Sequence, residues 1–135
     1  MIKVQVTVNA PIQQVWESYN NPSEIQKWNF ASEDWYCPHA ESDFVVGGRF
    51  SSTMSAKDNS FSFDFSGHFT EIIPDEKLAY HIEDGRNVVV LFSTIGKETH
   101  IDCSFEPEHE NPEALQQEGW QAILNNFKSY VENKS

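Results

Sequence analysis

Hydrophobic and polar residues alternate strictly at the beginning of the chain. Every second residue is aliphatic over residues 2–8 and the residues between are polar, which is the period of a half-buried β-strand. After Pro11 the apolar residues recur at the three- and four-residue spacing of a helix. These residues are Ile12, Val15, Trp16 and Tyr19. The pattern therefore predicts a strand followed directly by a short amphipathic helix.

A second short helix is predicted immediately after the first. An Asn-Asn-Pro sequence that ends at Pro22 stops the first helical pattern, because proline disrupts a helix interior. Ser23 is followed three residues later by Gln26, which is the arrangement of a capping box. The new turn carries Ile25 and Trp28 as its apolar residues. We therefore expect two short helices in tandem.

Short β-rich runs follow from about residue 35 to residue 105. They are separated by turn-forming pairs such as Gly47-Gly48 and Asp84-Gly85, and this spacing is typical of an antiparallel meander. In the clearest run, residues 60–73, one face is aromatic around Gly67 and the other is polar. The aromatic residues of that face are Phe61, Phe63, Phe65 and Phe69.

The last segment predicts one long helix. Asn111 is a favourable N-cap and Pro112 a favourable first helical residue. Large apolar side chains then continue at helical spacing: Trp120, Ile123, Leu124, Phe127 and Val131. The whole pattern predicts an α+β fold in a single domain, residues 1–135. In this fold a curved antiparallel sheet of about six or seven strands wraps around the C-terminal helix.

The space between that helix and the sheet is either packed core or a ligand cavity. Its expected lining is aromatic and aliphatic: Phe61, Phe63, Phe65, Phe69, Trp120, Leu124 and Phe127, with Trp28 and Phe50 at the mouth. Gly67 and Gly119 are expected to leave room beside these side chains. His81 is adjacent to Tyr80 in a β-run, so one of the two must face inward. If it is His81, this residue supplies a polar contact inside the cavity.

Composition and charge narrow the classes of partner. The ten Phe, four Trp and four Tyr make the chain rich in aromatic residues. The formal net charge of −12 argues against binding to nucleic acids and to anionic membranes. No stretch has the roughly 20 apolar residues of a membrane span, and the start does not resemble a signal peptide. We therefore expect a cytoplasmic protein, a monomer or homodimer, in which Cys37 and Cys103 are free thiols.

Sequence signatures of catalysis are absent. The chain contains no G-x-S-x-G, no H-E-x-x-H, no phosphate-binding loop and no dinucleotide glycine motif. His68, His100 and Asp64 fall on the polar faces of their runs. Arg49 or Arg86 can either hold a ligand carboxylate at the cavity mouth or form a surface ion pair. We expect no cofactor and no metal site, and whether the protein is an enzyme stays open, with the sequence favouring a protein that is not.

Several local sequences, in this order, also carry a family resemblance. They include Val46-Gly47-Gly48-Arg49-Phe50, Phe65-Ser66-Gly67, Glu71-Ile72-Ile73-Pro74 and Gly119-Trp120. With the order of elements, they resemble the START-like (SRPBCC) superfamily and, within it, the family named for the activator of heat-shock protein 90 ATPase. The resemblance covers nearly the whole chain. It implies a helix-grip fold with a deep cavity between the C-terminal helix and the sheet.

Three functions are compatible with this picture. The first is the binding of an apolar or aromatic small molecule in the cavity. The second, suggested by the family name, is a co-chaperone-like contact with a chaperone or another protein through the acidic surface. The third is a cyclase- or hydrolase-like reaction in the cavity that uses a histidine or a tyrosine. The aromatic face of residues 60–73 favours the first.

Overall fold

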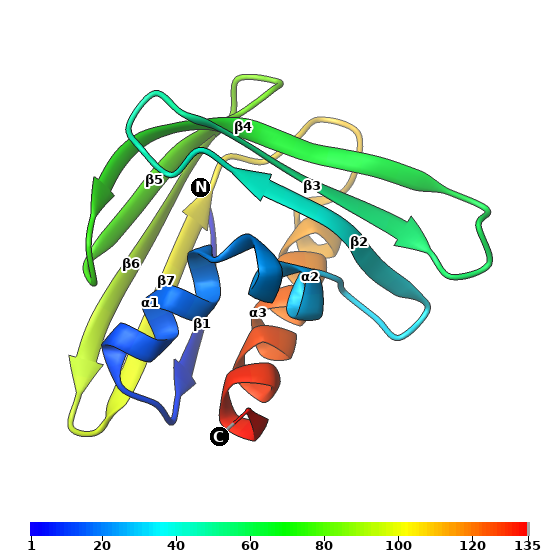
Figure 1. Cartoon of the computed structure of the whole chain (residues 1–135). Helices are drawn as coiled ribbons and strands as arrows, with labels where there is room; N and C mark the ends of the chain where they lie inside the picture. The colour runs from blue at the N-terminus through cyan, green and yellow to red at the C-terminus, as the bar shows by residue number, and fades with distance from the viewer. Residues whose placement is uncertain (135) are drawn as a thin grey trace.

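The computed structural model describes residues 1–134 and shows a curled sheet wrapped around one long helix (Figure 1). In chain order the elements are β1 (Ile2–Val8), α1 (Ile12–Asn20), α2 (Pro22–Trp28), β2 (Trp35–Ser42), β3 (Arg49–Ala56), β4 (Ser62–Ile73), β5 (Lys77–Ile82), β6 (Asn87–Ile95), β7 (Glu98–Phe105) and α3 (Glu113–Asn133). The predicted α+β helix-grip fold, with two short helices after the first strand, is confirmed.

All strands belong to one seven-stranded antiparallel sheet with the order β1-β7-β6-β5-β4-β3-β2. The strands from β2 to β7 are neighbours in sequence order, so the predicted meander is confirmed. The first strand, β1, pairs with the last along its whole length, from Ile2 opposite Phe105 to Val8 opposite Thr99. As a result, β1 and β2 form the two edges of the sheet.

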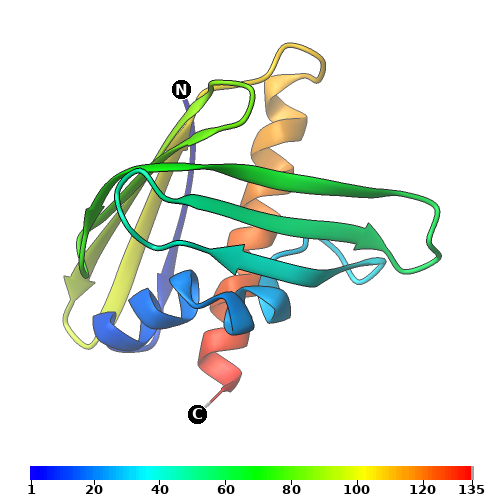
Figure 2. The same ribbon diagram turned by 45° about the horizontal axis from the view of Figure 1, so that its top comes forward.

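The long helix α3 covers the edge at β1. Gln117 Nε2 donates a hydrogen bond to the carbonyl oxygen of Lys3 at 3.0 Å. One turn later, Gln121 Nε2 donates to the carbonyl oxygen of Gln5 at 2.9 Å. An uncovered edge would leave such backbone groups without partners, so these glutamines complete the hydrogen bonding of the sheet and fix α3 against it. Both views show α3 on the concave side of the sheet (Figures 1 and 2).

The core lies between the concave face of the sheet and the helices. The side chains that α3 buries there include Leu124, Phe127 and Val131. From the sheet side, β1, β6 and β7 contribute Val4, Val90 and Ile101. Within residues 1–134 no helix is long and apolar enough to cross a membrane.

Both predicted helix caps differ from the structure, the first by two residues and the second by one. The N-cap of α2 is Asn21, whose Oδ1 accepts a hydrogen bond from the backbone N–H of Ser23 at 3.0 Å. The predicted capping box at Ser23 is therefore wrong. The proline between Asn21 and Ser23 takes the first helical position, and Asn21, the residue before it, becomes the cap. In α3 the N-cap is Pro112 and no side chain caps the helix, so the predicted cap at Asn111 is also wrong.

The two internal glycines do not leave room in the cavity, contrary to the prediction. A Cβ atom on Gly67 would lie 2.0 Å from the backbone oxygen of His81, so this glycine permits a close approach between β4 and β5. A Cβ atom on Gly119 would meet nothing within 4 Å. Neither residue lines the cavity described below.

Candidate functional site

A cavity of about 230 Å³ lies between the concave face of the sheet and the three helices. Its wall is formed by α1, α2, α3 and by strands β1 to β5 and β7. Of the residues predicted to line it, the wall contains Trp28, Phe50, Phe63, Phe65, Phe69, Trp120 and Leu124. Phe63 is 43% exposed, so the cavity meets solvent beside this residue.

Three residues predicted to line the cavity lie elsewhere. Phe61 precedes β4 in the β3–β4 hairpin, which extends away from α3 (Figure 2), and its side chain is 58% exposed. His81 points to the outer face, because it pairs with the outward-facing His68. Phe127 is completely buried and belongs to the core behind the wall. These corrections remove the only histidine among the predicted cavity residues.

The aromatic rings of the wall hold one another in place. The indole of Trp120 stacks on Phe105 with ring centroids 3.9 Å apart, and it meets Phe65 edge-on at 5.8 Å. On the opposite side, Phe50 packs edge-on against Tyr80 at 4.9 Å and lies 5.1 Å from Phe69. Such aromatic pairs are worth about 0.5 to 1.5 kcal/mol each beyond the area they bury. They therefore stabilise the arrangement of the rings around the cavity.

Two tyrosines belong to the wall; the sequence did not predict Tyr19, and it left Tyr80 open as the alternative to His81. Tyr80 faces inward from β5 in place of His81, and Tyr19 reaches the cavity from α1. Burial is the main cause that raises the pKa of both phenols above its ordinary value. Burial also raises the pKa of the neighbouring Cys103 thiol to about 12. At neutral pH all three groups are therefore protonated.

The remaining polar residues of the wall are uncharged, with one exception. Ser42, Ser52, Asn20 and Asn29 are neutral, and Glu41 is the only acidic or basic residue that residues 1–134 contribute to the wall. Glu41 pairs with Ser51 on the outer face of the sheet. Its carboxylate lies 3.5 Å from the outer side chain of His39. The interior of the cavity therefore carries no charged side chain.

The polar residues considered for chemistry lie on the surface. Arg49 Nε is 3.3 Å from a carboxylate oxygen of Glu83, and Arg86 Nε is 2.8 Å from one of Asp84. Neither arginine lines the cavity, so the surface ion pair is confirmed and the carboxylate clamp is wrong. Both cysteines are free. In the described part of the chain, residues 1–134, no group of three or more His, Cys, Asp or Glu could hold a metal ion.

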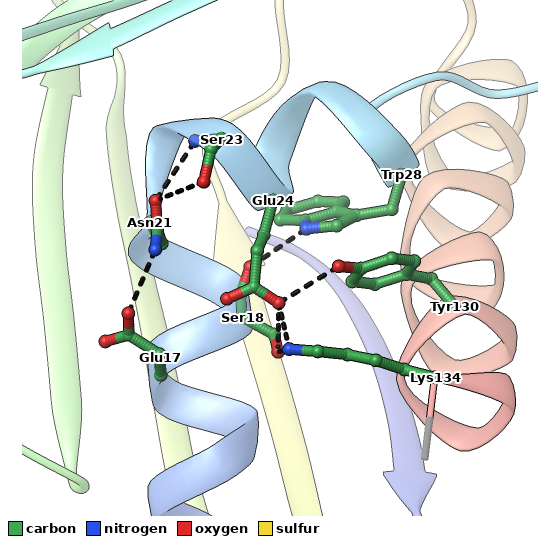
Figure 3. A network of polar contacts seen from close by, with 8 residues as sticks. All are labelled: Glu17, Ser18, Asn21, Ser23, Glu24, Trp28, Tyr130 and Lys134. Atoms are coloured by element: carbon green, nitrogen blue, oxygen red, sulfur yellow. Dashed lines mark hydrogen bonds and ion pairs between the residues drawn. The ribbon is translucent and has the colours of Figure 1, made fainter.

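A network of polar contacts holds α1 and α2 against the C-terminal end of α3 (Figure 3). At its centre, Glu24 Oε1 accepts hydrogen bonds from Ser18 Oγ at 2.9 Å and from the hydroxyl of Tyr130 at 3.0 Å. The ammonium group of Lys134 pairs with the same carboxylate. Trp28 Nε1 donates to the carbonyl oxygen of Ser18 at 3.0 Å. The network therefore positions the Trp28 ring on the cavity wall.

Replacing Glu24 by glutamine is expected to lower the free energy of unfolding by about 1 to 2 kcal/mol at neutral pH. Burial alone would raise the pKa of Glu24, but the hydrogen bonds from Lys134, Ser18 and Tyr130 outweigh it and lower the pKa. A carboxylate with a lowered folded-state pKa stabilises the protein above its unfolded-state pKa, about 4.3. This stabilisation disappears as the pH falls through the folded-state value.

Urea unfolding of wild type and Glu24→Gln from about pH 3 to about pH 8 measures this difference. The two free energies should converge at the acidic end. Glu118→Gln, at an exposed position of α3, is the matched control and should stay within about 0.5 kcal/mol of wild type. A difference for Glu24→Gln that is the same at every pH would contradict the role of its charge.

The curled sheet, the long covering helix and the cavity with its aromatic wall together define a START-like (SRPBCC) helix-grip domain. Residues 9–132 match the family described as Activator of Hsp90 ATPase homolog 1-like protein, and the chain belongs to this family. The resemblance noted in the sequence is thereby confirmed. No curated protein matches the chain significantly.

Solved structures of similar proteins have the same fold. An AHSA1-like protein from Aeromonas hydrophila is 41% identical, with a TM-score of 0.91 over 98% of this chain and 94% of that one. A protein from Cytophaga hutchinsonii is 50% identical, with a TM-score of 0.84 over 98% and 92% of the two chains. A protein from Chromobacterium violaceum shares the fold at 22% identity, with a TM-score of 0.86 over 97% and 96%.

Proposed function

We propose that this protein binds a small apolar or aromatic molecule in the cavity between α3 and the sheet. The observation that carries the proposal is the cavity itself, about 230 Å³ in volume and walled by interlocked aromatic rings. An apolar cavity of about 150 Å³ in another protein accommodates benzene. The larger volume here suits a molecule of about two fused or linked rings.

The cavity exposes apolar side chains to water when it holds no ligand, because it is open to solvent beside Phe63. Contact of apolar surface with water costs about 25 cal/mol per Å². An apolar ligand would remove that surface from water. A larger side chain at Ser52 or Cys103 would fill part of the space, yet both positions carry small residues. The small residues at these two positions therefore favour a cavity that binds a ligand.

The chemistry of the wall favours binding over catalysis. A hydrolase- or cyclase-like reaction needs a general base or a nucleophile near the substrate. No histidine lines the cavity in residues 1–134. The raised pKa values of Tyr19, Tyr80 and Cys103 keep these groups protonated at neutral pH. They are therefore suited to donate hydrogen bonds to a bound molecule.

A protein contact is the second candidate function, and one surface feature favours it. Phe61 lies 6.1 Å from Trp35 and 6.0 Å from Phe63, measured between ring centroids, and forms an exposed aromatic cluster at the β3–β4 hairpin. Exposed apolar clusters often mark interaction sites. The cluster adjoins the open side of the cavity, because Phe63 belongs to both.

A screen of the purified protein against lipids, aromatic polyketides, flavonoids and hormones tests the leading proposal. We expect at least one compound to form a one-to-one complex in native mass spectrometry and to raise the thermal unfolding temperature in a saturable way. The increase should follow the ligand concentration, because the ligand binds only the folded state. If no compound in a broad panel binds, small-molecule binding is refuted and the exposed aromatic cluster becomes the leading site.

A further inference from the structure

Several hydroxyl groups that face the cavity have no hydrogen-bond partner in the protein. Ser42 Oγ is completely buried and makes no hydrogen bond within the described residues. The side chains of Ser52 and Tyr80 are also buried, with only 5% and 8% of their surfaces exposed. None of the hydrogen bonds formed among residues 1–134 involves the hydroxyl of Ser52, Tyr80 or Tyr19. All of these residues line the cavity.

Unpaired hydroxyls at buried positions require an explanation, because most buried polar groups in proteins are hydrogen-bonded. Comparable hydroxyls elsewhere in this protein are paired: Ser51 Oγ bonds Ser66 Oγ at 2.8 Å, and Thr99 Oγ1 donates to the carbonyl oxygen of Ala10 at 2.8 Å. Of the two completely buried side-chain oxygens without a partner in residues 1–134, Ser42 Oγ lies on the cavity wall, and Asp102 Oδ1 lies on the other face of the sheet, opposite Leu91. The unpaired hydroxyls named above all lie on the cavity wall. A bound molecule with its own polar atoms would complete their hydrogen bonds.

The charge of the wall limits what that molecule can be. In the described part of the chain, no side chain that faces the interior is acidic or basic, since Glu41 points to the outer face beside His39. The two arginines are engaged on the surface with Glu83 and Asp84. A carboxylate, phosphate or ammonium group placed inside would lose its hydration without gaining an opposite charge. Neutral hydroxyl and carbonyl groups avoid that loss.

We propose that the natural ligand is an uncharged aromatic molecule whose hydroxyl or carbonyl groups bond to Tyr19 or Tyr80 and to Ser42 or Ser52. This inference rests on the proposed small-molecule binding and specifies its chemical class. The tyrosines lie on α1 and β5, and the serines on the adjacent strands β2 and β3. Polar groups on two parts of the wall would thus orient a flat ligand held between aromatic rings.

A matched series of naphthalene derivatives tests the inference by isothermal titration at pH 7. The series comprises naphthalene, neutral naphthol, anionic naphthoate and cationic naphthylmethylamine, which share one ring system and differ in a single group. We expect naphthol to bind about 2- to 12-fold more tightly than naphthalene for each hydrogen bond gained. Both charged compounds should bind at least about tenfold more weakly than naphthol.

Variants of the wall identify the groups that select naphthol. The double variants Tyr19→Phe with Tyr80→Phe and Ser42→Ala with Ser52→Ala remove only hydroxyl groups. In at least one of them the ratio of naphthol to naphthalene affinity should fall toward one. Tyr36→Phe, on the exposed part of β2, is the control in which this ratio should stay as in wild type.

The outcomes separate this inference from the proposed function. If naphthoate or naphthylmethylamine binds as tightly as naphthol, or if neither double variant changes the affinity ratio, the uncharged hydrogen-bonding ligand is refuted while small-molecule binding stands. If none of the four compounds binds although a compound of the screen does, the inference is overturned while the proposed function stands. If neither set contains a compound that binds, both proposals are refuted. Selective binding of naphthol with a reduced ratio in a double variant supports both.

Discussion

Replacing Gly67 by alanine is expected to lower the free energy of unfolding by at least about 3 kcal/mol. The added Cβ atom would lie 2.0 Å from the backbone oxygen of His81 and 3.0 Å from the ring of Phe50. The backbone oxygen cannot move without disturbing the pairing of β4 with β5, where Gly67 lies opposite Ile82. The change therefore strains the pairing of β4 with β5 rather than filling the cavity.

Gly119→Ala is the matched control for this substitution. Its Cβ atom would meet nothing within 4 Å, and alanine in a helix is more favourable than glycine by about 0.5 to 1 kcal/mol. We therefore expect Gly119→Ala to stabilise the protein slightly. Urea unfolding followed by tryptophan fluorescence measures both variants. Equal effects of the two substitutions would contradict the close approach at Gly67.

The sequence predicted the sheet and the long helix well, because their burial follows regular periods. The alternation over residues 2–8 matches β1, whose Val4 and Val8 are buried. The apolar spacing after Pro112 matches the face of α3 that buries Leu124 and Phe127. The turn pair Asp84-Gly85 lies between β5 and β6, as expected. Local periodicity determines these elements with little tertiary influence.

The cavity lining was less predictable, because strand alternation shows which side chains share a face but not what covers that face. Phe61 shares the phase of Phe63 and Phe65, yet the hairpin carries it beyond α3 into solvent. For His81 and Tyr80, the sequence left the inward residue undecided. The pairing of Tyr80 with the inward-facing Phe69 decides it.

The polar part of the wall was not predicted from the sequence. Ser52 lies in β3 in phase with Phe50, Met54 and Ala56, so the alternation marks its side chain as inward-facing. A serine at such a position does not by itself indicate a cavity wall. Ser42 ends β2 after an irregularity between Tyr36 and His39 that changes the register. The contribution of Tyr19 also depends on tertiary packing, because the orientation of α1 is set by the contacts of Glu24 with α3.

Ser52→Leu is expected to reduce the affinity for a ligand of the cavity by at least about tenfold, or about 1.4 kcal/mol. Ser52 lines the cavity and is 5% exposed. A leucine at this position would extend into the space that the ligand needs. Because the cavity provides room for the larger side chain, we expect this variant to fold. Its unfolding free energy should lie within about 1 kcal/mol of wild type, below the usual cost of overpacking.

Ser93→Leu is the matched control, because it introduces the same side chain at an exposed position of β6. Its affinity for the ligand should equal that of wild type.

The most direct test of the cavity as the binding site is a titration of wild type, Ser52→Leu and Ser93→Leu with the strongest ligand from the screen, after circular dichroism has established that each variant is folded. We expect a loss of affinity in Ser52→Leu alone. Equal affinity in all three folded proteins would place the ligand elsewhere and contradict the account.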